Sequence, residues 1–330
     1  MAIACPPLKD LPPAPEGRRG WPWTEASDPA PPRLPDGRPW PVISVVTPSY
    51  NPGPFLEEAL RSVLLQGYPA LEFIVMDGGS NDGSLEVFQR YRPWLAHFYS
   101  GPDRGQSHAI NKGLARATGE LVLWFNADDL CLPGSFITAS RALAAHPGSN
   151  LVVGGGIFID AQGRELSREP ACFDSWHDYV FRRCMIRQWC TFFRRQVLEE
   201  AGGVNESLQY CMDRDLLIRI TRRHWPLLVD QYFTAYRAHG GAKTRKDDTF
   251  IPRVAESDRA ALAQLAGTPW HDKFRRWRAY NWLGFSNKQS LSLPQRLRCL
   301  YQAIRLSPQV VVTPDFKQAL GGLWRGRPPE

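Results

Sequence analysis

Three kinds of segment are missing from this sequence of 330 residues. No run approaches the roughly 20 uninterrupted apolar residues that a membrane-spanning helix needs, and the N-terminus has no compact apolar segment of the signal-peptide type. The seven cysteines form no C-x-x-C pair, which argues against a zinc ribbon and a thioredoxin-type redox motif. Such an irregular set of thiols is typical of a reducing compartment, so we expect a cytoplasmic protein.

Acidic residues are also in short supply, with 33 Asp and Glu against 40 Lys and Arg and a formal net charge of +7. The excess lies in residues 268–330, where 11 basic and three acidic residues give +8, while the other 29 basic and 30 acidic residues give −1. An acidic partner, either a nucleic acid or an anionic membrane, is therefore a question about the C-terminal segment alone. The 43% hydrophobic content supports one large domain with appendages.

Composition divides the chain into three parts. Residues 1–41 hold 12 of the 29 prolines, which predicts an extended, irregular arm. Residues 42–250 form the expected main domain, and 251–330 form a helical, basic C-terminal segment. Because indole rings are costly to leave in water, we expect the three tryptophans of the arm to dock onto the folded body. They are Trp21, Trp23 and Trp40.

Short β-branched runs alternate with amphipathic stretches from Val42 onward. This alternation predicts an α/β fold with a mostly parallel central sheet flanked by helices. The predicted strands are Ile43–Thr47, Glu72–Met76, His97–Ser100, Leu121–Phe125, Leu151–Val153 and Ile157–Ile159. The predicted helices are Phe55–Gln66, Ser84–Tyr91, one that carries Ile110 and Leu114 with Ser107 as its cap, Gln196–Ala201 and Asp213–Arg223.

Four polar clusters follow predicted strands, where open α/β sheets place their ligand crevice. The first, residues 47–51, has small and turn-forming residues that let a ligand approach the backbone, although an ordinary turn is a serious alternative. In the second, residues 77–84, the Asp77 carboxylate can accept hydrogen bonds from a base or a sugar. This loop has neither the G-K-[ST] nor the G-x-G-x-x-G pattern. Asp82 and Ser84 have an alternative role as helix caps.

The third and fourth clusters are richer in charge. Residues 103–106 precede a predicted helix on which His108, Asn111 and Lys112 share a face, and a solvated face explains Lys112 equally well. The fourth cluster, Asn126-Ala127-Asp128-Asp129, places two carboxylates after a strongly apolar strand. Adjacent carboxylates repel each other, and a Mg²⁺ or Mn²⁺ ion bound to nucleotide phosphates would compensate them. The alternative for Asp129 is a helix N-cap.

Taken in order, these motifs resemble the catalytic domain of family 2 glycosyltransferases with the GT-A fold, and among them the bacterial enzymes that build surface polysaccharides. The resemblance covers residues 41 to about 244. The segments that carry it are Val46-Thr47-Pro48-Ser49-Tyr50-Asn51, residues 77–84, Asp103-Arg104-Gly105-Gln106 with Asn111-Lys112-Gly113, the strand that ends at Asp128, and Met212-Asp213-Arg214-Asp215-Leu216.

The resemblance implies a nucleotide diphosphate sugar donor, with a UDP-type donor favoured, and a divalent metal held by Asp128 and His239. It implies that Asp213 is the base that takes the acceptor's proton, with Asp215 as runner-up. First-turn charge that opposes the helix dipole is the alternative role for one of these two aspartates. The donor-binding residues that the resemblance implies are Thr47, Pro48, Tyr50, Asn51, Asp77, Gly78, Asp103, Arg104, Asn111, Lys112, Asn126 and Asp128.

The sequence departs from the family pattern at three positions. Asn126 replaces the first carboxylate of the Asp-x-Asp triplet, so that metal binding depends more on Asp128, or Asp129 takes a share. Met212 stands where Glu is common before the base, and His108 stands where Asp is common. Gln188, ahead of an apolar pair, is a candidate for the acceptor site.

These observations predict a metal-dependent, inverting glycosyltransferase that acts on a hydroxyl of a glycan or lipid-linked acceptor in cell-surface polysaccharide synthesis. The alternative is a non-catalytic nucleotide-sugar or nucleic-acid binding protein. Because Asp77, Asp128 and Asp213 are all present, we favour the enzyme and expect no nucleic-acid partner. For residues 268–330 we expect a peripheral contact at the inner face of the cell membrane, with a solvated basic helix packed on the main domain as the alternative.

Overall fold

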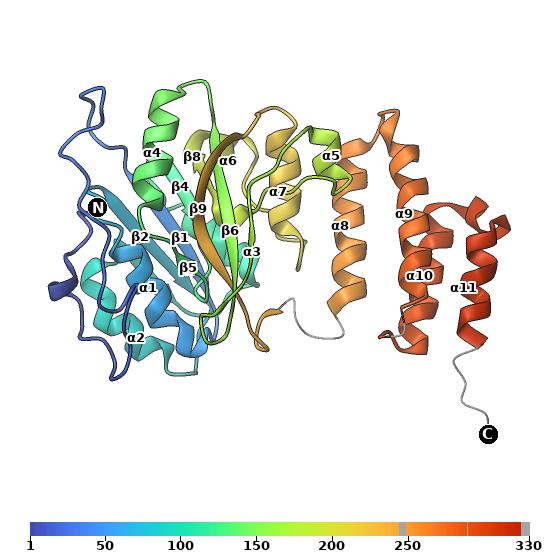
Figure 1. Cartoon of the computed structure of the whole chain (residues 1–330), viewed down its shortest axis with the longest axis horizontal. Coiled ribbons are helices and arrows are strands. Elements are labelled where there is room, and N and C mark those ends of the chain that lie inside the picture. The colour runs from blue at the N-terminus through green and yellow to red at the C-terminus, as the bar shows by residue number, and fades with distance from the viewer. Residues whose placement is uncertain (244–248, 289, 325–330) are drawn as a thin grey trace. The chain divides into compact units, whose positions relative to one another are not determined.

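The computed structural model describes residues 1–243, 249–288 and 290–324 of the chain (Figure 1). Contacts divide the chain into two units, residues 1–240 and residues 241–330. Each unit has its own hydrophobic core, so each is described by itself.

A nine-stranded sheet forms the centre of the first unit in the described part of the chain. Its strand order is β3-β2-β1-β4-β8-β6-β9-β5, and β7 pairs with β6. Helices flank this sheet, as predicted (Figure 1). The strands are β1 (Ile43–Ser49), β2 (Leu71–Asp77), β3 (His97–Ser100), β4 (Leu121–Trp124), β5 (Leu130–Cys131), β6 (Leu151–Asp160), β7 (Glu165–Glu169), β8 (Thr191–Arg194) and β9 (Leu227–Ala238).

The sheet has a parallel half and a mixed half. In the parallel half, β3-β2-β1-β4, each strand runs parallel to its neighbours, as the sequence predicts. In the mixed half, β8-β6-β9-β5 with β7, only β6 and β9 are parallel, because β8 reverses direction beside β4 and β6. The two predicted strands around 151–159 are one continuous strand, β6. The glycines that separate them in sequence lie within this strand, and position 154 requires glycine because a Cβ there would lie 2.5 Å from the carbonyl oxygen of Gln231.

The helices of the first unit connect and cover these strands. Helix α3 begins at Gln106 with Gly105 as its N-cap, so the predicted cap at Ser107 is wrong. The Ser107 hydroxyl instead donates to the carbonyl oxygen of Leu208 at 3.1 Å. Helix α4 is not among the predicted helices. The helices are α1 (Leu56–Leu64), α2 (Ser84–Tyr91), α3 (Gln106–Leu114), α4 (Ser135–Ala145), α5 (Trp176–Val180), α6 (Arg195–Glu200) and α7 (Met212–Thr221).

The proline-rich arm packs on the body of the first unit. Trp23 and Trp40 are buried, and Trp21 donates its indole N–H to the carbonyl oxygen of Cys131 at 2.9 Å, which confirms that the tryptophans dock. The arm is held by Arg61 of α1, a buried cation. Its guanidinium donates to the carbonyl oxygens of Pro12, Pro22 and Trp23 at 2.8 to 3.0 Å. These hydrogen bonds replace the hydrogen bonds to water that the guanidinium loses on burial.

The second unit is helical, as predicted. Its buried residues include Trp282, whose indole N–H donates to Asp258 at 2.8 Å, and Arg278, which pairs with the same carboxylate at 2.5 Å. None of the described helices is long and apolar enough to cross a membrane. The helices are α8 (Phe250–Leu265), α9 (Trp270–Ser286), α10 (Leu293–Leu306) and α11 (Pro314–Trp324).

Candidate active site

The ends of the parallel strands bring the predicted clusters together. The sheet register pairs Ser49 with Asp77 and Asp77 with Ser100, so the ends of β1, β2 and β3 lie side by side. The fourth cluster follows β4, whose residue Trp124 pairs with Val46 of β1. Open α/β sheets bind ligands at this edge.

The Asp77 carboxylate organises its own loop. It is buried and accepts hydrogen bonds from the backbone N–H groups of Gly79 and Ser80 at 3.0 and 2.9 Å. The hydroxyls of Ser80 and Ser100 donate to it at 2.5 and 2.6 Å. Four donors fill most of the capacity of a carboxylate. The structure therefore gives Asp77 a loop-shaping contact set, and its predicted contact with the base stays a prediction.

A small surface beside this loop fits a planar or polar ligand. A Cβ at Gly78 would lie 2.9 Å from a carboxylate oxygen of Asp103 and 3.4 Å from the ring of Tyr50, so only glycine leaves this approach open. The Tyr50 ring is 68% exposed. The Thr47 hydroxyl is buried and has no hydrogen-bond partner within the described residues. A buried polar group without a partner calls for a ligand or a water molecule.

Two further loop residues have local roles. Asn51 has a positive φ of 48°, and its side-chain oxygen accepts from the N–H of Asn81 at 2.9 Å. Pro48 lies in β1 itself. Asp82 accepts from the N–H of Ser84 at 3.2 Å and so supports the start of α2, although the N-cap residue is Gly83.

The third cluster does not form one ligand face. The Asn111 amide donates to the carbonyl oxygen of Val204 at 2.8 Å and accepts from the N–H of Val204 at 2.9 Å, so it holds the segment before α7. Lys112 lies 3.5 Å from the centre of the Tyr99 ring. His108 accepts from the N–H of Arg104 at 3.2 Å. Helical spacing placed these side chains near one another, but tertiary partners turn them to different neighbours.

The metal-side prediction rests on a pair from distant strands. Nε2 of His239 lies 3.0 Å from Oδ2 of Asp128. The His239 ring packs on Phe55, with ring centres 4.6 Å apart. The predicted N-cap role of Asp129 is wrong, because α4 begins at Ser135 with Gly134 as its cap. Asp129 is buried and accepts from the side-chain amide of Asn126 at 2.9 Å.

Arg237 is a central residue that the sequence argument missed. Its buried guanidinium donates to Glu58 at 2.8 Å and to the carbonyl oxygen of Asp128 at 3.2 Å, and its backbone N–H donates to Asp129 at 3.0 Å. Burial raises the pKa of Asp129 well above its ordinary value, the charge of Asp128 raises it further, and the contacts with Arg237 and Asn126 oppose the rise. The sequence signal that could have identified Arg237 is its position two residues before His239, the predicted metal ligand.

The donor set around Asp128 fits a hard divalent cation. The described residues hold no group of three or more His, Cys, Asp or Glu side chains placed to bind a metal. Two protein ligands, however, are what Mg²⁺ commonly uses when substrate phosphates supply the rest. The side-chain oxygen of Asn126 is buried and lacks a partner within the described residues, which adds a third oxygen in this cluster.

The two aspartates of α7 have different surroundings. Asp215 is buried and paired with Arg219 at 2.8 Å, and Arg219 also donates to the carbonyl oxygen of Gly203 at 2.9 Å. This contact set is structural. Asp213 is partly buried in the first turn. Burial raises the pKa of Asp213, and the backbone N–H and the charge of Arg214 oppose the rise.

Gln188 begins the short 3₁₀-helix η4 (Gln188–Cys190). Its side chain is buried and donates to the carbonyl oxygen of Trp124 at the end of β4. The residue predicted to face the acceptor therefore fastens η4 to the sheet instead.

Comparisons with known proteins agree with this geometry. A family model described as glycosyl transferase family 2 matches residues 44–202. An uncharacterized glycosyltransferase of Mycobacterium tuberculosis (strain CDC 1551 / Oshkosh) is 31% identical over 184 residues, which cover 54% of this chain and 68% of that protein. The chain belongs to glycosyltransferase family 2, and it is a glycosyltransferase.

Two other proteins extend the comparison. A PGL/p-HBAD biosynthesis glycosyltransferase of Mycobacterium bovis (strain BCG / Pasteur 1173P2) is 28% identical over 231 residues, which cover 67% of this chain and 87% of that protein. The crystal structure of S. aureus TarS 1–349 in complex with UDP-GlcNAc matches with a TM-score of 0.62 and 19% identity over 82% of each chain. At that identity the likeness concerns the fold alone, and it confirms the predicted GT-A fold.

Proposed function

We propose that this enzyme is a metal-dependent, inverting glycosyltransferase that moves a sugar from a nucleotide diphosphate sugar to a hydroxyl of a glycan or lipid-linked acceptor in cell-surface polysaccharide synthesis. The observation that carries the proposal is the Asp128 and His239 pair, 3.0 Å apart, at the edge of the sheet where the strand-end loops meet. The biosynthetic role of the Mycobacterium bovis relative supports the choice of acceptor class.

The donor binds at the ends of β1 and β2 in this proposal. Tyr50, Gly78 and Asp103 surround a surface open to a base or ribose, and the Thr47 hydroxyl, which has no partner among the described residues, lies near the end of β1. A UDP-type donor is favoured because TarS, which shares the fold, is described with UDP-GlcNAc and with UDP.

Asp128 and His239 hold Mg²⁺ or Mn²⁺ in this proposal. When bound, the ion supplies positive charge that offsets the charge gathering on the departing diphosphate. Arg237 keeps the Asp128 loop in place, and the Phe55 ring supports His239.

Asp213 acts as the base. Its carboxylate takes the proton of the acceptor hydroxyl while the acceptor oxygen bonds to the anomeric carbon and the bond from that carbon to the diphosphate breaks on the opposite face. A pKa raised by burial brings this carboxylate closer to the range that suits a base near neutral pH. Asp215 is engaged by Arg219 and is not the base in this proposal.

A donor panel tests the proposal. With Mn²⁺ present, the full chain is expected to release nucleoside diphosphate from one sugar donor, and Asp213→Asn is expected to lower kcat about 10²- to 10⁴-fold. Asp128→Asn is expected to weaken the response to Mn²⁺. Asp36→Asn, an exposed change in the arm, serves as the matched control. Near-normal turnover by Asp213→Asn would remove that residue from the base role.

The second unit supplies a membrane contact in the same proposal. Along α10, four exposed apolar side chains fall at helical spacing on one face: Leu293, Leu297, Tyr301 and Ile304. The exposed Arg298 and Arg305 flank this apolar stripe. The net charge of +8 in residues 268–330 opposes pairing with a second copy and favours an anionic lipid surface. We place the enzyme at the inner face of the cell membrane on this basis.

Flotation with vesicles that contain phosphatidylserine tests this contact. The full chain is expected to float, and Leu297→Glu with Tyr301→Glu is expected to remain in the dense fraction. Leu166→Glu, an exposed leucine in β7, is the control. Equal flotation of the stripe variant and the control, or dimer formation that the stripe variant abolishes, would overturn the lipid assignment.

A further inference from the structure

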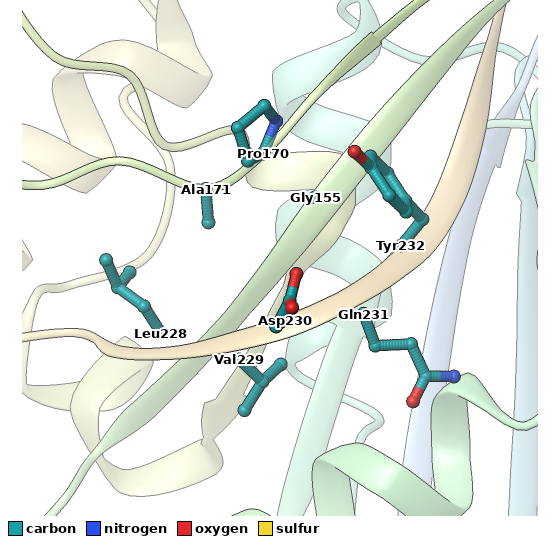
Figure 2. Close-up of a pocket in the computed structure, with 8 residues that line it drawn as sticks. All are labelled: Gly155, Pro170, Ala171, Leu228, Val229, Asp230, Gln231 and Tyr232. Carbon is teal, nitrogen blue, oxygen red and sulfur yellow. The ribbon is translucent and has the colours of Figure 1, made fainter.

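A pocket of about 270 Å³ lies in the mixed half of the sheet (Figure 2). Gly155 of β6 forms its floor, Leu228, Asp230 and Tyr232 of β9 form one wall, and Pro170 and Ala171 after β7 lie opposite. None of the residues proposed for the donor, the metal or the base lines it. The pocket is therefore a separate feature that the reaction has not accounted for.

An irregular stretch of β9 builds this pocket. Val153 of β6 pairs with Leu228 and Gly155 pairs with Tyr232, so three residues of β9 face the single residue Gly154. Such a bulge re-aims side chains locally. Figure 2 shows Asp230 and Tyr232 on the side of β9 that faces Pro170 and Ala171.

The neighbouring residues fix this arrangement. Gln231 points to the other side of β9, where it accepts from the Thr138 hydroxyl at 2.5 Å. A Cβ at Gly155 would lie 2.7 Å from the Tyr232 ring, so the floor of the pocket requires glycine.

The chemistry of the pocket suits a sugar. A sugar ring offers an apolar C–H face, which packs on an aromatic ring, and hydroxyls at its edge, which donate to a carboxylate. Tyr232 supplies the ring, and the Arg168 guanidinium lies 5.5 Å from the centre of that ring. Asp230 supplies an exposed carboxylate that no protein group within the described residues bonds. Three residues before Leu228 in the chain, the Trp225 ring is 61% exposed and packs edge-on against Phe173, with ring centres 5.1 Å apart.

Other ligand classes fit less well. A lipid chain would cover the Asp230 carboxylate without giving it a hydrogen bond, which is costly. A phosphate or another anion would be repelled by the same charge. Sugar hydroxyls meet the carboxylate without either penalty.

A chain of contacts connects the pocket to the active site. Glu169, which precedes Pro170, forms an ion pair with Arg187. Gln188, which follows Arg187 in the chain, donates to the carbonyl oxygen of Trp124 at the end of β4. Strand β9 itself continues from Tyr232 toward His239. At about 3.3 Å per residue, these seven steps place the pocket roughly 23 Å along the chain from the metal-side pair. That span covers several sugar rings.

We propose that this pocket is a glycan subsite that binds the acceptor chain several sugars away from the hydroxyl that reacts. The inference rests on the proposed function, because it takes the acceptor to be an oligosaccharide. It assigns Asp230 as the hydroxyl acceptor and Tyr232 as the stacking surface. Such a subsite makes the enzyme prefer a growing chain to a single sugar.

Two separate measurements test the subsite. The first is binding of the full chain, without donor, to a printed array of bacterial oligosaccharides and their component monosaccharides. The second is release of UDP from a UDP-sugar panel with water as the acceptor, which reports the chemical site alone. The variants are Asp230→Ala and Tyr232→Ala, and the matched control is Asp272→Ala, which removes an exposed carboxylate of the second unit.

The wild type is expected to bind oligosaccharides but not monosaccharides. Asp230→Ala and Tyr232→Ala are each expected to weaken this binding about tenfold or more, while donor hydrolysis stays within about twofold of the wild type. Asp230 is exposed, so its variant remains informative even if Tyr232→Ala folds poorly.

The outcomes separate the two proposals. Binding by both variants equal to that of the control, or no oligosaccharide bound by the wild type, overturns the subsite even when donor hydrolysis is normal. Absence of donor hydrolysis from every UDP-sugar with the wild type counts against the UDP-type donor instead, whatever the array shows.

Discussion

The parallel half and the mixed half of the sheet satisfy their polar groups in different ways. In the parallel half, Asp77 bonds Ser80, three residues away, and Ser100, 23 residues away. Where the end of β9, in the mixed half, meets the loop after β4 and helix α1, His239 contacts Asp128 across 111 residues and Arg237 contacts Glu58 across 179. The Asp77 loop is therefore held by neighbouring loops, whereas the metal side depends on the closure of the whole unit.

This difference determines where the molecule is most sensitive. A loop that bonds to itself loses local shape when one partner is removed. Arg237 is a hub, a residue whose contacts join three elements: α1, the loop after β4 and the end of β9. Its replacement therefore affects all three elements.

The largest expected effect on stability comes from the hub. Arg237→Met leaves the Glu58 carboxylate without its cation, and loss of one partner from a buried ion pair typically costs about 3–5 kcal/mol of unfolding free energy. Urea denaturation would measure it, with Arg164→Met as the control because its pair with Asp160 is exposed. Equal losses for both variants would remove the distinction between hub and surface.

A smaller loss is expected from the parallel half. Asp77→Asn replaces an acceptor of four hydrogen bonds with an amide that can satisfy only some of the donors, at a cost of about 1–3 kcal/mol. The same urea titration measures it, with Asp36→Asn as the control. A loss larger than that of Arg237→Met would reverse the comparison between the two halves.

The next prediction concerns pH and Asp213. Burial raises the pKa of this carboxyl in the folded state, so the folded protein binds the proton more tightly than the unfolded chain does. The free energy of unfolding of the wild type is therefore lowered at pH values above the raised pKa of the folded state, where both states are ionised. This loss disappears below the ordinary Asp pKa near 4. Asp213→Asn should be more stable than the wild type at neutral pH.

Paired unfolding titrations across this pH range test the sign. The stability difference between Asp213→Asn and the wild type should shrink as the pH falls toward the ordinary Asp value. Asp215→Asn is the contrast on the same helix, because it breaks a buried pair with Arg219 and should destabilise the protein. A destabilised Asp213→Asn at neutral pH would contradict the assigned burial cost.

The smallest effect is expected at the surface of the donor side. Arg104→Ala breaks a pair with Glu206 in which the arginine side chain is 70% exposed, so the unfolding free energy should change by no more than about 0.5 kcal/mol. The midpoint of thermal unfolding would show it. A loss comparable to that of Asp77→Asn would mean that the third cluster supports the fold more than its exposure indicates.

The parallel half could be predicted because its strands are short apolar runs with polar residues at their ends. β3 and α2 begin and end at the predicted residues, and β1, β2 and β4 differ by one or two residues. In the mixed half, only β6 carries that signal. β8 and β9 form because distant segments pair, and β7 is an exposed strand with three charged residues, Glu165, Arg168 and Glu169.

The candidate site divides in the same way. The residue types at the strand ends were evident from the sequence, and the pairing of Asp128 with His239 followed from the resemblance to the family. The partner of each side chain was not evident, because Asn111, Gln188 and Asp215 turn to backbone or charged groups up to 95 residues away. Arg237 and the pocket at β9 depend on burial and register, which no local pattern encodes.

The docking of the arm on Arg61 has a practical consequence for anyone who shortens this chain. A segment with 12 prolines looks like a dispensable linker, and trimming before Pro41 would be a natural choice for expression. The cut would remove three carbonyl partners of a buried guanidinium. It would also remove Leu11, Leu34 and Trp40 from the hydrophobic core of the first unit, so the shortened protein is expected to precipitate rather than to crystallise more readily.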